Sequence, residues 1–349
     1  MNPASTLTLA LTLALTRAWL RRGPLACALY PVSLLFRALA GLRGLLYRTG
    51  VLKSSRLPVP VIVVGNIFIG GTGKTPLTIW LVEQLRAAGL KPGVISRGFG
   101  SKGDGPRPVT ALSTPAEVGD EPVLIATRAA CPVFVYRDRV QAGRALLAAH
   151  PEVNVIVTDD GLQHYALQRD VEVVLFDGRG VGNGWTLPAG PLREPPSRRR
   201  DVTVVNAPEL TPRLAARVGG QPYRMVLAGD TAERLGDRRE RVPLRYIGGR
   251  GRLAAAAGIG NPARFFRMLA DAGLVFQELP LPDHHDFLDR PFAHVDADVI
   301  LVTEKDAVKC AQIEELRNDP RLWVVPVSAR LDAALVDHIV EKCRGRTFA

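Results

Sequence analysis

A glycine-rich loop offers the clearest chemistry in the chain. Residues 70–75 read Gly-Gly-Thr-Gly-Lys-Thr and stand between an apolar, β-branched run at 59–64 and a helical pattern at 74–88. In such a strand–loop–helix unit, successive backbone N–H groups and the positive end of the helix can wrap a phosphate. We therefore expect a nucleotide to be bound by Gly70, Gly71, Thr72, Gly73, Lys74 and Thr75. Lys74 would reach the β- and γ-phosphates, and Thr75 would hold Mg²⁺.

The loop departs from the strict phosphate-loop motif at one position. That motif requires glycine at position 68, where this chain has Phe68. The departure weakens the match to the pattern, but the physical argument for anion binding rests on the loop and the helix N-terminus.

A pair of carboxylates follows a second apolar run. Residues 153–158 are typical of a buried strand, and Asp159 and Asp160 come directly after it, ahead of Gly-Leu-Gln-His at 161–164. A carboxylate at the end of a strand near a phosphate loop can hold Mg²⁺ directly or through water, as in a Walker-B site. The residues leave open which of the two aspartates would touch the metal.

Several other polar groups are less specific. They occur at 96–100, 119–122, 192–195, 283–285 and 303–306, and each taken alone is typical of a turn, a helix cap or a surface group. The group at 303–306 contains Lys305 directly before Asp306, whereas guanine readers have one residue between the lysine and the aspartate. Guanine specificity is therefore not supported.

Charge and cysteine content narrow the class of protein. The 349 residues carry a net charge of +11, but the first acidic residue is Glu83, and nine basic residues precede it. The basicity is thus local to the N-terminal part, and with 6% aromatic residues it does not indicate nucleic-acid binding. The four cysteines form no CxxC pair or Cys/His cluster, which argues against disulfides and zinc and fits a reducing compartment.

The N-terminal part is predicted to lie on a membrane. Two apolar runs, 7–20 and 24–36, are each too short to span a bilayer, and arginines flank them. This pattern favours insertion into the interface, with the arginines meeting anionic headgroups. A signal peptide would have its positive charge before the apolar run, and an ordinary core helix would leave the excess of arginine unexplained.

Strands and helices are predicted to alternate through the rest of the chain. Short buried-strand patterns at 91–96, 132–136, 153–158, 171–176 and 202–205 indicate a doubly wound, mostly parallel α/β sheet. Strands are hard to place in the charged region 230–252, and a smaller α/β set follows it. We expect a membrane-associating segment at 1–52, a P-loop core at 53–220, and a linker with a smaller α/β lobe at 221–349.

These motifs together resemble the tetraacyldisaccharide 4'-kinase family. The resemblance is carried, in order, by residues 65–66, 70–76, 96–98, 119–122, 159–164, 188–195, 258–262 and 303–310. It implies an ATP- and Mg²⁺-dependent kinase that phosphorylates the 4'-hydroxyl of an acylated disaccharide 1-phosphate in lipid A biosynthesis. It also implies a monotopic or peripheral enzyme at the cytoplasmic face of the inner membrane, whose acylated substrate stays in the bilayer.

The resemblance also suggests roles for single residues. It implies that Asp120 is the catalytic base and that a histidine from the second lobe is its partner. We favour His284 over His285 for that partner, and a base and a partner on different lobes would make catalysis depend on lobe closure. Substrate contacts are expected from the motif residues Gln163, Arg193 and Glu194. The sequence carries no signal for oligomeric state.

A rival interpretation uses the same loop and basic anchor. A membrane-associated P-loop ATPase switch would bind a protein partner instead of modifying a lipid. That group usually has a lysine directly before the double glycine, where this chain has Ile69.

Overall fold

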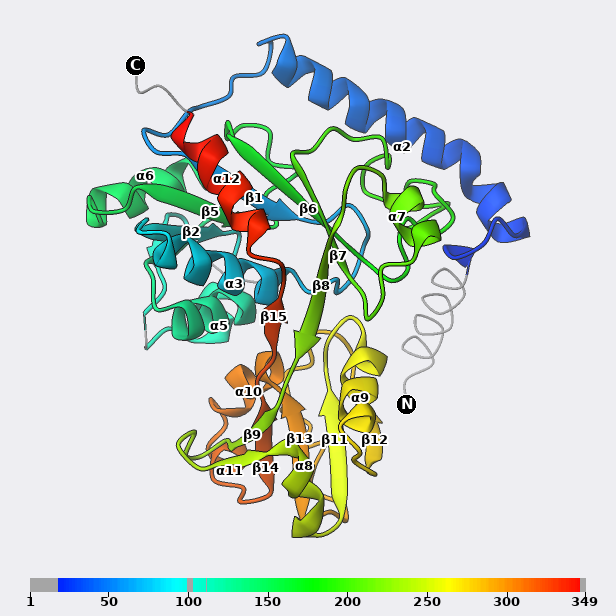
Figure 1. Ribbon diagram of the computed structural model, residues 1–349, viewed down its shortest axis with the longest axis vertical. Coiled ribbons are helices and arrows are strands. Elements are labelled where there is room, and N and C mark those ends of the chain that lie inside the picture. The colour runs from blue at the N-terminus through cyan, green and yellow to red at the C-terminus, as the bar shows by residue number, and fades with distance from the viewer. Residues whose placement is uncertain (1–17, 99–102, 111, 346–349) are drawn as a thin grey trace. The chain divides into compact units, whose positions relative to one another are not determined.

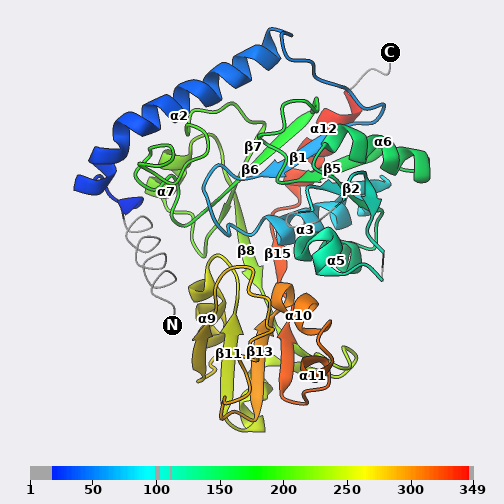
Figure 2. The same ribbon diagram turned by 180° about the vertical axis from the view of Figure 1, so that it is seen from behind.

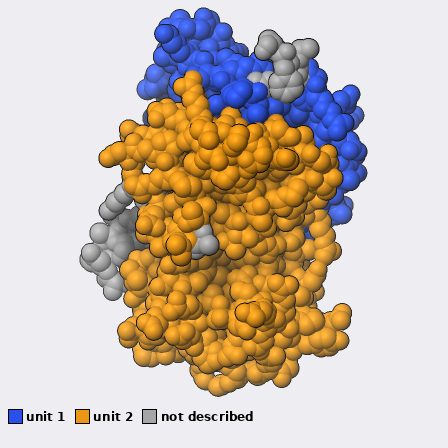
Figure 3. Space-filling view, turned by 90° about the vertical axis from the view of Figure 1, so that its left-hand side faces the viewer, with its two compact units in different colours: residues 1–74, 155–226, 331–349 blue, residues 75–154, 227–330 orange. Residues whose placement is uncertain are grey.

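The computed structural model describes residues 18–98, 103–110 and 112–345. The chain divides into two compact units, coloured separately in Figure 3, and each is made of non-contiguous segments. Unit 1 consists of residues 1–74, 155–226 and 331–349, and unit 2 consists of residues 75–154 and 227–330.

Unit 1 is built on a parallel sheet with the strand order β8-β7-β6-β1-β5 (Figure 1). The strands are β1 (Val61–Gly65), β5 (Val155–Asp159), β6 (Val171–Asp177), β7 (Val202–Asn206) and β8 (Tyr223–Ala228), the last ending just beyond the unit. All four pairings are parallel, and β1, β5 and β7 are buried at every residue. Such continuous apolar strands are typical of a sheet covered on both faces. The helices α7 (Pro212–Val218) and α12 (Ala334–Arg344) complete the unit.

The apolar N-terminal run belongs to the long helix α2 (Pro24–Arg48), drawn in blue in Figure 1. On one side, Ser33 donates a hydrogen bond to the Thr186 carbonyl at 2.5 Å, and the ring of Tyr30 lies 4.4 Å from that of Trp185. The other side exposes a stripe at helical spacing, formed by Leu25, Val32, Leu35, Leu39 and Leu42.

The run 24–36 was expected to be too short to span a membrane, and this expectation was wrong, because the run is only the first half of a 25-residue helix. The helix continues past Phe36 to Arg48, because Arg37, Arg43 and the two glycines that follow Phe36 do not end it. By length and apolar composition, α2 is sufficient to cross a bilayer. Most of the first run, residues 7–17, lies outside the described residues.

The first part of unit 2 surrounds a short three-stranded arrangement. Strand β2 (Pro92–Ser96) pairs in parallel with β4 (Val133–Val135), and β3 (Arg107–Pro108) pairs with β4 in the antiparallel sense. Its helices are α3 (Lys74–Ala87), α4 (Pro115–Val118), α5 (Asp120–Ala129) and α6 (Arg139–Ala149). Asp138 caps α6 by accepting hydrogen bonds from the backbone of Val140 and Gln141.

The second part of unit 2 is a six-stranded sheet in the order β10-β9-β14-β13-β11-β12. The strands are β9 (Thr231–Arg234), β10 (Arg241–Pro243), β11 (Leu253–Ala257), β12 (Gln277–Pro280), β13 (Val299–Thr303) and β14 (Leu322–Val325). The neighbouring elements are α8 (Leu244–Ile247), η1 (Gly248–Arg250), α9 (Pro262–Asp271), α10 (Glu304–Cys310), α11 (Glu314–Arg317) and β15 (Ser328–Arg330). Figure 2 shows β11 and β13 side by side, with α10 following β13.

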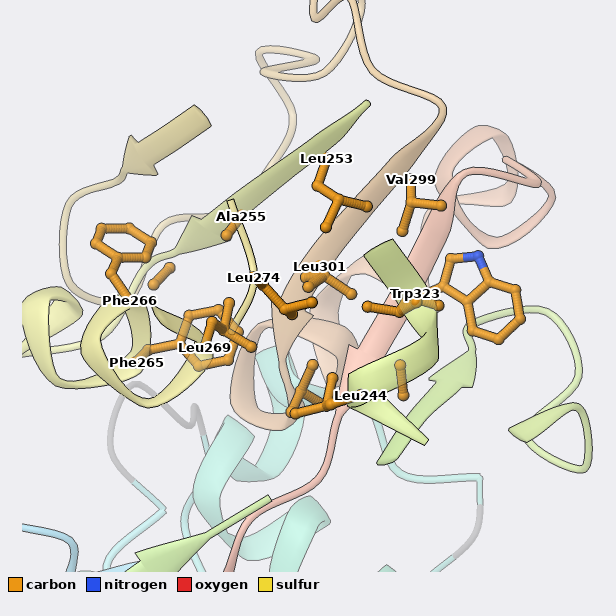
Figure 4. Packing of buried hydrophobic residues seen from close by; sticks show 14 residues of the cluster. Leu244, Leu253, Ala255, Phe265, Phe266, Leu269, Leu274, Val299, Leu301 and Trp323 are labelled. Atoms are coloured by element: carbon orange, nitrogen blue, oxygen red, sulfur yellow. The ribbon is translucent and has the colours of Figure 1, made fainter. Parts of the chain in front are cut away.

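This sheet packs apolar residues on both of its faces. Leu253, Ala255 and Leu301 face the cluster shown in Figure 4, whereas Ala254 and Ile300 face a second cluster. The alternation follows from the two-residue period of a strand. The charged region 230–252 contains the antiparallel pair β9 and β10, which its many arginines concealed at the sequence level. The expected α/β class with parallel sheets is confirmed.

Candidate active site

The phosphate loop, residues 66–75, leaves the end of β1 in unit 1 and is organised by Asn66. The Asn66 amide donates hydrogen bonds to the Phe68 carbonyl at 2.6 Å and to the Thr72 hydroxyl at 3.0 Å. Its oxygen accepts a hydrogen bond from Lys74 Nζ at 3.2 Å. The Asn206 amide holds the loop from β7 through the Thr72 carbonyl at 2.8 Å. Asn66 thus fixes both the loop and its lysine, a role that the sequence motif alone did not reveal.

Glycine is required in the loop at two of its positions. Gly70 and Gly73 have φ angles of 99° and 100°, which side chains rarely allow. Phe68 is not among the residues with positive φ; it is buried, and the Arg179 guanidinium lies 4.2 Å from its ring centroid. The non-glycine residue at 68 is therefore accommodated without backbone strain.

The two aspartates after β5 differ in their surroundings. Asp159 is the last residue of the strand and is buried, whereas Asp160 is partly exposed and has a φ of 49°. Lys74 Nζ lies 3.7 Å from Asp160, and Arg193 donates hydrogen bonds to both of its oxygens at 3.1 and 3.2 Å. Lys74, Asp160 and Arg193, three of the residues expected in the site, are thus brought together within unit 1.

Gln163 and Glu194 form a second contact in unit 1. The Gln163 amide donates to Glu194 at 2.8 Å, and Tyr165 and Arg198 donate to the other Glu194 oxygen at 2.9 and 2.7 Å. Both oxygens of this buried carboxylate therefore have partners. The Gln163 carbonyl also accepts a hydrogen bond from Arg43 of α2 at 3.0 Å, which connects the apolar helix to this contact.

Asp120 and His284 meet inside unit 2. Asp120 is the first residue of α5, it is buried, and its Oδ2 lies 3.1 Å from His284 Nδ1. His285 is occupied elsewhere, with its Nε2 at 3.3 Å from Asp289 and its Nδ1 accepting a hydrogen bond from the Phe287 backbone. The geometry therefore favours His284 as the partner of Asp120. Both residues belong to unit 2, one to its segment 75–154 and the other to its segment 227–330. The dependence of catalysis on lobe closure stays a prediction.

Two lysines of α10 complete what we call the aspartate cluster, which consists of Asp120, His284, Lys305 and Lys309. Lys309 Nζ lies 3.2 Å from Asp120 Oδ2, and Lys305 Nζ lies 3.9 Å from the same atom. Sequence reasoning missed both lysines as neighbours of Asp120, because nothing in the spacing of 120 and 303–310 shows that the two segments meet.

The cluster changes the acidity of its members. Burial alone would raise the pKa of Asp120, but the hydrogen bond with His284 and the charges of Lys305 and Lys309 hold that pKa far below its ordinary value. The same hydrogen bond to Asp120 raises the pKa of His284 above its ordinary 6.5, against burial and the charge of Lys305. Asp120 is therefore an anion over the whole physiological range.

The donors available for a metal ion are few. Among the described residues, no group of three or more His, Cys, Asp or Glu side chains could hold a metal by itself. The hydroxyl of Thr75 and the carboxylates of Asp159 and Asp160 are hard oxygen donors, which fit Mg²⁺ when phosphate oxygens supply the remaining ligands.

The parallel α/β sheet has a glycine-rich loop between β1 and α3 and carboxylates at the end of the neighbouring strand β5, which is the arrangement of a P-loop nucleotide-binding protein. The model of the tetraacyldisaccharide-1-P 4'-kinase family matches residues 25–344, and the chain belongs to this family.

Relatives and a solved structure agree with that family. A tetraacyldisaccharide 4'-kinase from Janthinobacterium sp. (strain Marseille) is 63% identical, with 96% of this chain and 97% of the relative covered. One from Herminiimonas arsenicoxydans is 59% identical, with 95% and 96% covered. The structure of LpxK from Aquifex aeolicus in complex with ATP has a TM-score of 0.74 at 29% identity, covering 91% of this chain and 99% of that one.

These comparisons confirm the expected family, the kinase class and an ATP-dependent activity of lipid A biosynthesis. Nothing in them supports the alternative of an ATPase switch that acts on a protein.

Proposed function

We propose that Asp120 takes the proton of the acceptor hydroxyl when this kinase phosphorylates the 4'-position of a tetraacyldisaccharide 1-phosphate. The observation that carries the proposal is the 3.1 Å contact between buried Asp120 Oδ2 and partly exposed His284 Nδ1, beside the ammonium of Lys309. In the transfer, the hydroxyl oxygen forms a bond to the γ-phosphorus, the bond from that phosphorus to the β–γ bridging oxygen breaks, and ADP leaves. Because a transferring phosphoryl group needs positioning more than a strong base, an acceptor of low pKa suffices.

The proton then needs a further acceptor. Asp120 is too weak a base to keep it, so it passes to neutral His284, which must then be the tautomer with an unprotonated Nδ1, the atom that lies 3.1 Å from Asp120 Oδ2. This step requires neutral His284, and we expect kcat to rise with pH as His284 passes its raised pKa.

On the nucleotide side, the backbone of Gly70, Gly71, Thr72 and Gly73 cradles the phosphates of ATP, and Lys74 neutralises charge that develops on them. Lys74 is already held toward Asp160 and Asn66, at 3.7 and 3.2 Å. Thr75 with Asp159 or Asp160 would hold Mg²⁺, which supplies charge neutralisation at the β- and γ-phosphates when bound.

On the lipid side, Gln163, Arg193 and Glu194 position the disaccharide. Arg193 pairs with Asp160, and it can exchange that carboxylate for a substrate phosphate at little electrostatic cost. Glu194 acts by holding Gln163, Tyr165 and Arg198, since both of its oxygens are occupied.

The exposed stripe of α2 lies in the cytoplasmic leaflet of the inner membrane, where an acylated substrate resides. The stripe supplies the apolar contact, and Arg37, Arg43 and Arg48 of the same helix supply positive charge for anionic headgroups. This placement makes the enzyme monotopic or peripheral.

The test is to follow ³²P from γ-labelled ATP in detergent micelles that contain tetraacyldisaccharide 1-phosphate. We expect Mg²⁺-dependent label in the lipid, and a loss of that label in Asp120→Asn. Label that appears only as free phosphate would contradict lipid phosphorylation, and full lipid labelling by Asp120→Asn would contradict the role of Asp120.

A further inference from the structure

The segment 303–310, Thr-Glu-Lys-Asp-Ala-Val-Lys-Cys, supplies two lysines to the aspartate cluster and also contacts other parts of unit 2. It forms the end of β13 and the whole of α10. Thr303 Oγ1 and the Gly258 backbone N–H donate to the Asp306 carboxylate at 2.6 and 2.9 Å, and Thr303 Oγ1 accepts from the Asp306 backbone at 3.2 Å. The start of α10 is therefore fixed to the loop that follows β11.

Helix α10 forms ion pairs with α5 near both ends of α5. Lys305 Nζ lies 3.2 Å from Glu121 in the first turn of α5, and buried Glu304 lies 2.9 Å from Arg128 in the last turn. The two ion pairs have opposite polarity, so exchanging their partners on α5 would oppose like charges. This arrangement fixes the orientation of α5, which begins with Asp120.

Lys309 joins the two halves of the aspartate cluster. Its Nζ lies 3.2 Å from Asp120 Oδ2 and donates a hydrogen bond to the His285 carbonyl at 3.0 Å. It thereby links the first residue of α5 to the loop that carries His284. Gly258 packs closely against this loop and against α10. A Cβ at Gly258 would lie 2.9 Å from Asp306 Oδ1 and 3.2 Å from the Cβ of His285, so the position has no room for a side chain.

Lys305 and Lys309 differ in the number of carboxylates that lie close to each ammonium. Lys305 faces three carboxylates, Asp120, Glu121 and Asp283, at 3.9, 3.2 and 3.8 Å. Lys309 has its closest carboxylate contact with Asp120 alone and shares that oxygen with His284. Of the two lysines, Lys309 is thus the one that contacts both Asp120 and the loop that carries His284.

We propose that Lys309 is a positioning residue for the proton acceptor: its ammonium holds Asp120 Oδ2 against His284 and fastens the histidine loop to the same point. The inference rests on the proposed role of Asp120 as the acceptor. Without Lys309, Asp120 Oδ1 would keep the hydrogen bond from the Glu121 backbone at 2.9 Å, but Oδ2 would keep only His284 at 3.1 Å and the more distant Lys305 at 3.9 Å. Oδ2 would then be held less firmly, and small misplacements of reacting groups are costly in rate.

The test measures kcat, both KM values and the pH dependence for Lys309→Met and Lys309→Arg. For Lys309→Met we expect kcat to fall about 10- to 100-fold, with KM for ATP and lipid within about threefold of wild type. The rising limb of kcat should move to higher pH by about half a unit or more, because Asp120 then stabilises protonated His284 more strongly. Lys309→Arg keeps the charge and should keep the limb at its wild-type position.

A double mutant separates positioning from general structural support. If Lys309 acts through Asp120, then adding Lys309→Met to Asp120→Asn should lower kcat by less than about threefold further. Lys342→Met is the matched control, since it removes an ammonium that is paired with Asp201 at 2.8 Å in unit 1. This control should leave kcat and the pH profile unchanged.

Three results would contradict the role of Lys309 while leaving the role of Asp120 intact. They are a wild-type kcat in Lys309→Met, losses of kcat that multiply in the double mutant, or an effect of Lys309→Met confined to KM. The last would mean that Lys309 binds a substrate phosphate. If Asp120→Asn itself kept wild-type kcat, the proposed acceptor would fail and the inference would fall with it. The single Asp120→Asn variant therefore distinguishes the two failures.

Discussion

The phosphate loop and the aspartate cluster hold a charged side chain by different kinds of contact. The loop holds its cation by a contact between Lys74 and Asn66, eight residues apart, on a backbone shaped by glycine. The cluster holds its anion by a contact between Asp120 and His284, 164 residues apart, and by two lysines from a third segment. The first site thus starts from a local contact, to which Asp160 and Asn206 add distant ones. The second depends entirely on contacts between distant segments of unit 2.

The difference predicts that the two sites fail differently. Lys74→Met should lower lipid phosphorylation by about 10³-fold, because it removes the cation that faces the developing phosphate charge. ATP affinity should fall as well, measured by equilibrium binding of labelled ATP. Since Lys74 is held by local contacts, thermal unfolding should change little. Wild-type transfer by this variant would remove the phosphate loop from the mechanism.

A smaller loss is expected in the aspartate cluster when its histidine is replaced. His284→Gln should lower kcat about 10- to 100-fold without changing ATP affinity, since Asp120 remains but its proton has no onward acceptor. The rising limb of the kcat–pH profile should disappear. An unchanged limb would show that another group titrates there.

The same variant tests the linkage between charge and stability. The pKa of His284 is raised in the folded protein, so its contribution to stability is complete below its ordinary 6.5 and is lost as pH rises through the raised value. His284→Gln should therefore destabilise the protein more at acidic than at alkaline pH. Because the side chain is partly exposed, we expect less than about 1 kcal/mol in chemical denaturation. A difference that grows with pH would contradict the sign.

The smallest effect on the chemistry is expected for a residue that belongs to neither site. Leu35→Asp places a charge in the exposed stripe of α2, so binding to vesicles with anionic lipid should weaken severalfold. Transfer in detergent micelles should stay within about threefold of wild type, because Leu35 is exposed and contributes little to the fold. Cosedimentation measures the binding. Unchanged binding would mean that another surface meets the membrane.

Much of the fold follows from local patterns. The buried strands β1, β5, β6 and β7 are continuous apolar runs, and the loop at 70–75 identifies itself by its glycines. The strands β9 and β10 in 230–252 escaped sequence reasoning, because short strands in a region rich in arginine lack apolar alternation. The length of the apolar helix α2 was underestimated, because Arg37 was interpreted as the end of the apolar run.

Some contacts of the candidate site could also be expected from local sequence, whereas others depend on tertiary packing. Lys74, Asp160 and Arg193 could be expected to meet, since they follow neighbouring strands or belong to one motif. The approach of Lys305 and Lys309 to Asp120 could not, because it depends on how α10 packs against α5. Likewise, the full pairing of Glu194 with Gln163, Tyr165 and Arg198 is a tertiary property that spacing does not encode.

The most direct test of Asp120 as the proton acceptor is single-turnover transfer to the lipid by Asp120→Asn at saturating ATP. Asp201→Asn serves as the matched control, because it removes a carboxylate that is paired with Lys342 and belongs to neither site. We predict that Asp120→Asn slows transfer at least about 100-fold at every pH while ATP affinity stays within about threefold of wild type. Transfer at the rate of the control, or a loss that excess ATP restores, would contradict this account.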